Sequence, residues 1–257
     1  MLLAIDVGNT HIKFGLFQKK LLVNSWQTVS AHNQTGKRLY EIFQKKDIET
    51  NKIDTCVIGS VVPQLTSSCN TFSEKYLRQR AYIIGPATQL PLSVSCDRPQ
   101  LGADRLADIT ASYILYGKPM LVIGLGTATV FNVIDKKGTF IGGAIACGLN
   151  ATLTALTDSA ALLPRITLTV PLHTVGTNTV ENMQSGIIRG HASLVDGMID
   201  RIQQETGYTM QIIATGGASD MIAGQTNHRL LVNKNLTLEG LRILWEYNQD
   251  RTSVQTK

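Results

Sequence analysis

The sequence contains few cysteines, few aromatic residues and a modest number of charged residues. Its 257 residues include 4 cysteines, 6% are aromatic and 17% are charged, with a formal net charge of +5. No two cysteines form a CxxC pair, so a zinc ribbon is not indicated, and we expect reduced thiols in a cytoplasmic protein. Basic and aromatic residues are not interleaved, and we therefore expect no nucleic-acid partner.

Long apolar runs are also missing. The stretch from Gly138 to Val180 has little charge, since Asp158 and Arg165 are its only charged residues. Glycine, proline and many threonines interrupt it, which is unlike a membrane-spanning helix, and no secretory signal is visible before the first strand. We expect no membrane partner, and we predict that this stretch is buried in the core or in a subunit interface.

Two common nucleotide-binding signatures are absent. The sequence has no GxxxxGK[ST] motif, which argues against a P-loop kinase, and no GxGxxG motif follows a predicted strand. A content of 43% hydrophobic residues nevertheless predicts a folded protein with a large core. Any nucleotide site must therefore use other turns.

The first seventeen residues predict a strand, a tight turn and a second strand. Leu2–Ile5 is apolar, Asp6 follows, Val7–Thr10 forms the turn, and Ile12–Phe17 is the second strand. Such a turn can wrap a phosphate, because Gly8 lets the backbone approach closely and Asp6 can hold a cation or its waters. An ordinary hairpin uses the same residue types, and this motif alone leaves both interpretations open.

The same pattern of strand, small-residue turn and strand returns later in the chain. Met120–Ile123 is an apolar strand, Gly124–Thr129 is a turn, and Val130–Ile134 is the next strand. The repetition suggests a duplicated unit. A boundary at Gly117-Lys118-Pro119 then gives an N-terminal half, 1–117, and a C-terminal half, 118–257.

A late apolar strand, Gln211–Thr215, ends in Gly216-Gly217. Two phosphate-type turns and a late Gly-Gly turn suit a nucleotide clamped between two α/β halves. We therefore predict an α/β fold with mixed sheets, in which two similar halves of the actin and ribonuclease H type enclose a nucleotide cleft. Actin, hexokinase and Hsp70 share this architecture.

Helical periodicity appears in several other segments. Residues 34–46 have an apolar face, and a further helix opens after Gly102. Asn178 and Glu181 form an N-cap pair for a long helix that starts at about Thr179. The predicted apolar face of this helix consists of Met183, Ile187, Leu194, Met198 and Ile202, and the last helix is marked by Leu238, Leu241 and Trp245.

The segment Leu101–Arg105 places an aspartate and an arginine in the first turn of a helix. Free amides and the helix dipole favour anions there. Asp104 could accept a proton from a substrate hydroxyl, and Arg105 could hold a carboxylate or the migrating phosphoryl group. The alternative is ordinary helix-start chemistry, with Arg105 paired to Asp108. The segment alone does not decide between the two.

A series of short blocks runs through the chain in a fixed order: Asp6–Thr10, Ser60–Pro63, Leu101–Arg105, Gly126–Thr129, Gly142–Ile145, Val175–Thr179, Gln184–Gly186, Ala214–Gly217 and Leu236–Leu241. One block alone has little weight, but the full set at this spacing is specific. In this set the chain resembles the type III pantothenate kinases, which catalyse the first step of coenzyme A synthesis. The resemblance implies two domains of the actin-like superfamily.

The resemblance implies that three segments bind ATP. The first turn would hold the phosphates and the Mg²⁺ shell, with Asp6 as the magnesium residue, directly or through water. Gly126 to Ala128 would form the second phosphate turn, with Thr127 touching ATP, and Gly216 and Gly217 would border adenosine. The residues of the first turn are Asp6, Val7, Gly8, Asn9, Thr10, His11, Ile12 and Lys13.

The resemblance also implies a pantothenate site and a catalytic pair. Asp104 would be the general base on the primary hydroxyl, and Arg105 would be the second catalytic residue. The family forms homodimers with pantothenate near the interface, so the implied partners are ATP, pantothenate and a second copy of the chain. The implied pantothenate residues are Cys96, Gly102, Ala103, Asp104, Arg105 and Thr179.

Three positions differ from the family pattern. The family has an aspartate, which helps to bind an activating potassium or ammonium ion, where this chain has Gly124. Because glycine has no side-chain oxygen, the cation is lost, or backbone and water replace the ligand, or the protein is weak as a kinase. Cys96 stands in place of a tyrosine that contacts pantothenate, and Cys147 stands in place of a proline. We expect both cysteines to be small buried residues.

Three functions follow from these observations. The leading one is phosphorylation of pantothenate to 4'-phosphopantothenate with ATP and Mg²⁺ and an altered dependence on monovalent cations. The second is a non-catalytic or weakly active relative that binds nucleotide or pantothenate and acts through partners, as the changes at Gly124 and Cys96 would allow. The third is a kinase or ATPase of the same superfamily with another hydroxyl substrate.

Overall fold

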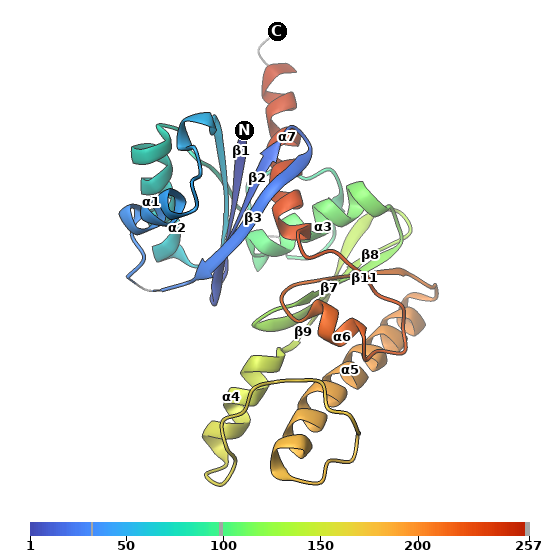
Figure 1. Cartoon of the computed structure of the whole chain (residues 1–257). Helices are drawn as coiled ribbons and strands as arrows, with labels where there is room; N and C mark the ends of the chain where they lie inside the picture. Colours follow the sequence, from blue (N-terminus) through green and yellow to red (C-terminus); the bar gives the residue numbers. More distant parts are fainter. Residues whose placement is uncertain (32, 98–99, 255–257) are drawn as a thin grey trace. The chain divides into compact units, whose positions relative to one another are not determined.

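The computed structural model describes residues 1–31, 33–97 and 100–254 (Figure 1). These residues form an α/β protein with two mixed β-sheets. None of the helices in these ranges is long and apolar enough to cross a lipid bilayer.

The chain divides into two compact units. Unit 1 consists of Met1–Tyr116 together with Asn235–Lys257, and unit 2 consists of Gly117–Lys234. The division after Tyr116 lies one residue from the boundary expected from the sequence. The segment that begins at Asn235 differs from expectation, because it belongs to unit 1 and not to the C-terminal half.

The sheet of unit 1 has the strand order β3 (Leu21–Val29), β2 (His11–Gln18), β1 (Leu2–Val7), β4 (Thr55–Ser60) and β5 (Tyr82–Ile84). All residues of the central strand β1 are buried. β1 is antiparallel to β2, which makes the predicted hairpin, and parallel to β4. A further short strand, β6, covers Ser93–Val94.

Helices cover both faces of this sheet. On one face the aromatic side chains of Phe43 and Phe72 pack with Leu3 and Ile5 of β1, and these residues belong to α1 (Gly36–Lys45) and α2 (Pro63–Phe72). Pro63 is the first residue of α2, a position where its missing N–H costs no hydrogen bond. The remaining helices of unit 1 are α3 (Ala103–Tyr116), α7 (Leu236–Val254) and the short η1 (Thr50–Lys52) and η2 (Ser73–Leu77).

Helix α7 belongs to unit 1 because its residues pack tightly on α3 and on the sheet. A Cβ atom at Gly240 would overlap the carbonyl oxygen of Ala107 in α3, so only glycine permits this approach. Gly59 of β4 similarly leaves room for the side chain of Leu241, which is fully buried. Sequence periodicity located this helix but contained no information on which half it would cover.

The sheet of unit 2 repeats the plan of unit 1. Its strands follow the order β9 (Thr139–Cys147), β8 (Ala128–Ile134), β7 (Met120–Leu125), β10 (Gln211–Thr215) and β11 (Leu231–Val232). The central strand β7 is antiparallel to β8 and parallel to β10, as β1 is to β2 and β4. Gly124 is the fifth residue of β7, and Asp6 is the fifth residue of β1, so the two occupy equivalent positions.

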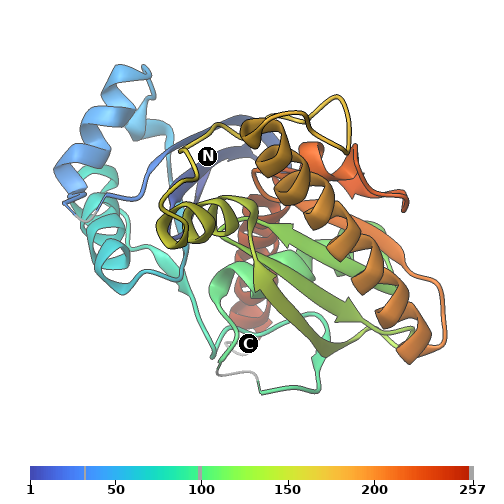
Figure 2. The same cartoon turned by 90° about the horizontal axis from the view of Figure 1, so that it is seen from below.

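Unit 2 contains the helices α4 (Leu149–Ser159), α5 (Thr179–Thr206) and α6 (Ser219–Ala223), and Figure 2 shows α5 beside the strands of this unit. The Asn178 side chain accepts a hydrogen bond from the Glu181 amide at 3.0 Å, which confirms the predicted N-cap. Leu194, predicted to be on the apolar face, is 38% exposed. The buried line runs instead through Ile188, Ala192, Val195 and Ile199, and Leu194 lies about 100° around the helix from Val195.

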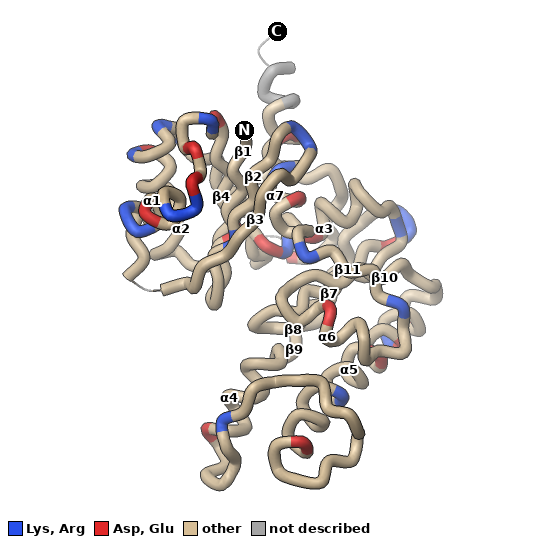
Figure 3. The backbone as a smooth tube through the Cα atoms, viewed as in Figure 1, with Lys and Arg blue, Asp and Glu red and all other residues tan. Residues whose placement is uncertain are grey.

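Only part of the charge-poor stretch is buried in the core, to which Phe140 and Leu149 belong. Leu162 and Leu172, which lie between α4 and α5, are 96% and 86% exposed. In Figure 3 the chain from β9 to the start of α5 carries few charged residues. Of the two predicted locations, the core does not hold for these residues, because the segment 160–178 has no regular structure and packs little of its apolar surface. The subunit interface stays a prediction.

Candidate active site

The first predicted phosphate turn connects β1 and β2. The Gly8 amide donates to the His11 carbonyl oxygen at 3.0 Å and closes the turn. Ser30, just beyond β3, holds the turn from the side, since its hydroxyl donates to the Gly8 carbonyl at 2.6 Å and its amide donates to the Thr10 carbonyl at 2.9 Å. Asn9 and Thr10 are exposed at the tip. The turn is thus fixed by hydrogen bonds to its backbone, one of them from the Ser30 side chain, while its polar tip is exposed.

Asp6 lies at the end of β1, directly before this turn. It is buried and pairs across the strands with Lys13 of β2. Burial raises its pKa to about 6, the charge of Lys13 lowers that pKa, and the charge of Asp104 raises it. Residues far apart in the sequence, Asp6 and Asp104, therefore lie within electrostatic reach of each other in unit 1.

Asp104 is held in one orientation by the start of α3. Its Oδ1 accepts a hydrogen bond from the Arg105 amide at 2.8 Å. A Cβ at Gly102 would lie 2.5 Å from this oxygen and 3.0 Å from the Val61 Cγ1. Glycine at position 102 therefore lets the carboxylate fold back over the chain at this point without a clash.

Arg105 and Cys96 lie near each other beside this carboxylate. Burial lowers the pKa of Arg105, while the charges of Asp104 and of a Cys96 thiolate raise it. Cys96 is partly buried, whereas Cys147 is exposed, so the expectation that both cysteines are buried is wrong for Cys147. Cys147 is the last residue of β9, opposite Ala128 at the edge of the second turn, where side chains reach solvent.

Asp108 is a buried carboxyl group that sequence reasoning did not assign to the site. Its Oδ1 accepts a hydrogen bond from the Thr237 hydroxyl of α7 at 2.7 Å. Burial raises the pKa of Asp108 to about 8, the bond from Thr237 lowers it, and the charges of Asp104 and Asp6 raise it. Asp108 follows Asp104 by four residues, so the sequence indicated that both lie on the same face of a helix. The burial of Asp108 could not be read from this spacing, because it depends on α7, which comes from the C-terminal end of the chain.

The second predicted phosphate turn connects β7 and β8 and is shorter than expected. Gly124 and Leu125 belong to β7 and Ala128 to β8, which leaves Gly126 and Thr127 as the exposed turn. The Gly126 amide donates to the Ala128 carbonyl at 3.0 Å. This bond closes the turn much as the Gly8 bond closes the first one.

Two glycines from other segments of unit 2 lie in close contact with the second turn. The Gly148 amide, at the start of α4, donates to the Thr127 carbonyl at 3.2 Å, and a Cβ at Gly148 would overlap that carbonyl. Gly216 has a positive φ of 98°, and a Cβ there would overlap the Leu125 carbonyl. The Gly216-Gly217 turn therefore lies against the end of β7, so the structure brings both predicted ATP segments of unit 2 together.

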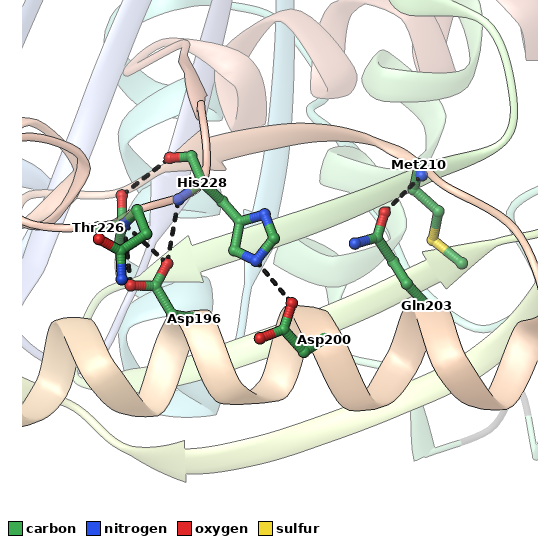
Figure 4. A network of polar contacts seen from close by, with 7 residues as sticks. Asp196, Asp200, Gln203, Met210, Thr226 and His228 are labelled. Carbon is green, nitrogen blue, oxygen red and sulfur yellow. Dashed lines mark hydrogen bonds and ion pairs between the residues drawn. The ribbon is translucent and has the colours of Figure 1, made fainter.

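Helix α5 anchors the chain that follows this Gly-Gly turn. The Asp196 carboxylate accepts hydrogen bonds from the amides of Asn227, at 3.0 and 2.9 Å, and of His228, at 3.2 Å. The His228 ring lies 2.8 Å from Asp200, one turn along the helix (Figure 4). Thr179, the predicted pantothenate residue of this unit, is the exposed first residue of the same helix.

The sequence is similar to known proteins over nearly its whole length. A model of the family described as type III pantothenate kinase matches residues 2–201. The type III pantothenate kinase of Roseiflexus sp. (strain RS-1) is 39% identical over 254 residues, which cover 97% of this chain and 100% of that protein. That of Myxococcus xanthus (strain DK1622) is 37% identical over 96% of this chain and 99% of its own length. The chain belongs to the type III pantothenate kinase family.

Solved structures confirm the predicted fold class of this pantothenate kinase. The activator of the 2-hydroxyisocaproyl-CoA dehydratase from Clostridium difficile superposes with a TM-score of 0.58 at 12% identity, over 98% of this chain and 97% of that one. A ROK family glucokinase from Streptomyces griseus gives a TM-score of 0.51 at 13% identity, over 93% and 97% of the chains. At these identities the likeness concerns the fold alone.

We predict that Asp108→Asn makes the kinase more stable at pH 8. An acid with a raised pKa keeps its proton in the folded chain and loses it on unfolding, so stability falls as pH rises from about 4 to about 8. Asparagine keeps the acceptor for Thr237 and removes this loss. Relief of about 2 kcal/mol would raise the Tm by about 6 °C at pH 8 and much less at pH 5.

Thermal unfolding between pH 5 and pH 8.5 measures this difference. Asp47→Asn, at an exposed residue with a positive φ of 52° that asparagine tolerates, is the control and should follow the wild type. Parallel curves of Tm against pH for the wild type and Asp108→Asn would refute the prediction.

Proposed function

We propose that the chain transfers the γ-phosphoryl group of ATP to the primary hydroxyl of pantothenate, giving 4'-phosphopantothenate, the first step of coenzyme A biosynthesis. Membership of the type III pantothenate kinase family supports this reaction. The observation that carries the chemistry is the Asp104 carboxylate, which is fixed over Gly102 within electrostatic reach of Asp6.

Asp104 is proposed to act as the general base. A primary alcohol is a weak nucleophile, and a carboxylate within hydrogen-bond reach assists its attack by accepting the proton. One Asp104 oxygen is engaged by the Arg105 amide, and we assign the other to the substrate proton. The Arg105 guanidinium would stabilise negative charge on the acceptor or on the transferred group. Gly102, Ala103, Cys96 and Thr179 are the further residues proposed to contact pantothenate.

ATP is proposed to bind through the three turns. Exposed residues with small side chains at the tips of both hairpin turns suit phosphate oxygens, and the open Gly217 leaves room for adenosine. The proposed residues are Asp6, Val7, Gly8, Asn9, Thr10, His11, Ile12, Lys13, Gly126, Thr127, Ala128, Gly216 and Gly217.

Magnesium is proposed to bind at Asp6, directly or through water. Among the described residues no cluster of three His, Cys, Asp or Glu side chains could hold a metal ion. A single carboxylate beside a phosphate turn fits Mg²⁺, which commonly uses one or two carboxylates together with substrate phosphates. When bound, the ion would neutralise phosphate charge. The residue of this chain that orients it is Asp6.

The position of Gly124 does not fit the monovalent-cation site inferred from the family. Gly124 pairs with Thr215 and Val130 on the neighbouring strands, and none of these three residues has a carboxylate. The Thr215 hydroxyl is buried, at 2% exposure, and has no hydrogen-bond partner among the described residues. One neutral hydroxyl supplies neither the charge nor the two oxygens of an aspartate, and we propose on this ground that potassium or ammonium is not required.

A homodimer is proposed on the exposed apolar side chains of unit 2. Ile145 of β9, Leu162, Leu172 and Val175 are 65%, 96%, 86% and 83% exposed, within a stretch that carries little charge. Exposed apolar surface of this kind is typical of protein interfaces. The partners proposed for the chain are therefore ATP, pantothenate and a second copy.

The proposed reaction is tested by incubating purified protein with pantothenate, ATP and Mg²⁺ and measuring phosphopantothenate by mass spectrometry. We expect Asp104→Asn to lower kcat by about 10²- to 10⁴-fold, because the general base is lost while the side-chain volume is kept. Asp47→Asn should have wild-type activity. An Asp104→Asn enzyme within threefold of the wild type, or a wild type that phosphorylates other alcohols in preference, would contradict the proposal.

The monovalent cation is tested by replacing potassium and ammonium with choline at constant ionic strength. We expect the wild-type rate to change by less than about twofold, since no charged ligand is present at Gly124. Gly124→Asp should create a dependence on potassium and a potassium-dependent rise in Tm, whereas Gly124→Asn, without the charge, should not. A wild-type enzyme that is inactive in choline would overturn this part of the proposal.

The homodimer is tested by sedimentation equilibrium. We expect a mass of two chains, and we expect Leu162→Glu combined with Leu172→Glu to shift the protein toward one chain, because charge in an apolar interface is costly. A wild type with the mass of one chain at micromolar concentration would rule out the dimer.

A further inference from the structure

One side-chain hydrogen bond holds Thr129, which lies just after the second phosphate turn. The Thr129 Oγ1 and the His191 Nε2 lie 2.8 Å apart. Both residues are buried, with exposures of 1% and 6%. Thr129 directly follows Ala128 and pairs with Leu125, so it closes the ladder of β7 and β8 at the base of the turn. This bond therefore acts on the chain next to the proposed ATP contacts.

The orientation of Thr129 follows from the alternation of β8. Phe131 and Val133, two and four residues later, share a core cluster with Ile187 and Val195 of α5. Side chains two residues apart lie on the same face of a strand. Thr129 thus points toward α5 from the end of this face nearest the turn, where His191 meets it.

Helix α5 is well suited to hold the turn in place. Thr179 begins the helix twelve residues before His191, about 18 Å along the axis. Five residues after His191, Asp196 binds the Asn227 and His228 amides (Figure 4). The helix is thus tied to the rest of unit 2 near His191 by bonds that do not involve the turn, which makes it a fixed support.

The Thr129 and His191 pair is not needed for packing. Two apolar groups of the same shape would fill this space without the cost of burying polar atoms. The hydrogen bond, unlike apolar packing, is directional. It fixes one rotamer of Thr129 and thereby the end of β8. Burial lowers the pKa of His191, so the ring is neutral near pH 7, and a neutral imidazole can donate to or accept from a hydroxyl.

We propose that His191 is a positioning residue for ATP, which holds Thr129 and thereby keeps the Gly126–Ala128 turn in the geometry that binds phosphate. This inference rests on the proposed function, in which that turn contacts ATP. His191 is buried against Thr129, and in this proposal its effect on the reaction passes through the backbone of the turn.

Four variants separate positioning from stability. His191→Phe and Thr129→Val each remove one partner of the bond and leave the other buried and unpaired. The double variant removes both polar groups, so it should regain most of the Tm lost by His191→Phe. His191→Gln places an amide nitrogen near the position of Nε2 and should restore the bond. His228→Phe, which removes another 2.8 Å bond on α5 away from the turn, is the control.

The measurements are the Kd of a fluorescent ATP analogue with Mg²⁺, the steady-state KM for ATP, kcat, and Tm. We expect His191→Phe, Thr129→Val and the double variant to raise the Kd and the KM for ATP about fivefold to tenfold, with kcat changed less than twofold. The range corresponds to one buried hydrogen bond. His191→Gln and His228→Phe should stay within twofold of the wild type.

Recovery of Tm in the double variant without recovery of ATP affinity would support the positioning role. A double variant that binds ATP as the wild type does would overturn it, because the bond would then serve stability alone. In that case wild-type nucleotide binding and pantothenate phosphorylation would be intact, and the proposed function would stand. A wild type that binds no nucleotide would overturn the proposed function and this inference together.

Discussion

The structure depends on a buried central strand in each unit that forms two hydrogen-bond ladders at once. Each central strand pairs antiparallel with the strand that follows it and parallel with a strand from much later in the chain. Because a hairpin turn must follow the first pairing, the turn lies beside the carboxyl end of the parallel strand. The register of β1 thereby places Asp6 beside Lys13, and that of β7 places Gly124 beside Thr215.

Close backbone approach is the second constraint on the site. Gly148 and Gly216 each stand where a Cβ would overlap a backbone carbonyl oxygen, and Gly102 stands where a Cβ would meet the Asp104 carboxylate. Removing the side chain lets turns and helix starts pack against one another, so polar backbone groups converge without the bulk of side chains between them. This close packing has an electrostatic cost as well as an entropic one. Burial raises the pKa of Asp6 and of Asp108, and the charge of Asp104 raises both further. Lys13 offsets part of this repulsion.

Local sequence patterns predicted the elements well. The hairpin at residues 2–17, the helix that starts at Thr179 with its Asn178 cap, and the strand Gln211–Thr215 all agree with the structure, because alternation, helical spacing and capping are short-range properties. The order of sequence blocks predicted the family. The exposure of Leu194 and Cys147 was predicted wrongly, because burial depends on which neighbouring segment covers a residue. The roles of the individual site residues stay predictions.

The sequence by itself determined the two hairpins, their glycine turns and the Asp-Arg pair at a helix start, since each is encoded by residues close together. It also determined the family, through the order of its short blocks. The tertiary structure decided that α7 completes unit 1, that Asp108 is buried against Thr237, and that His191 reaches Thr129. These contacts join residues 129 and 62 positions apart in the two hydrogen bonds. No local periodicity encodes such pairings, because they arise only when helices pack on one another or on a sheet and bring distant segments together.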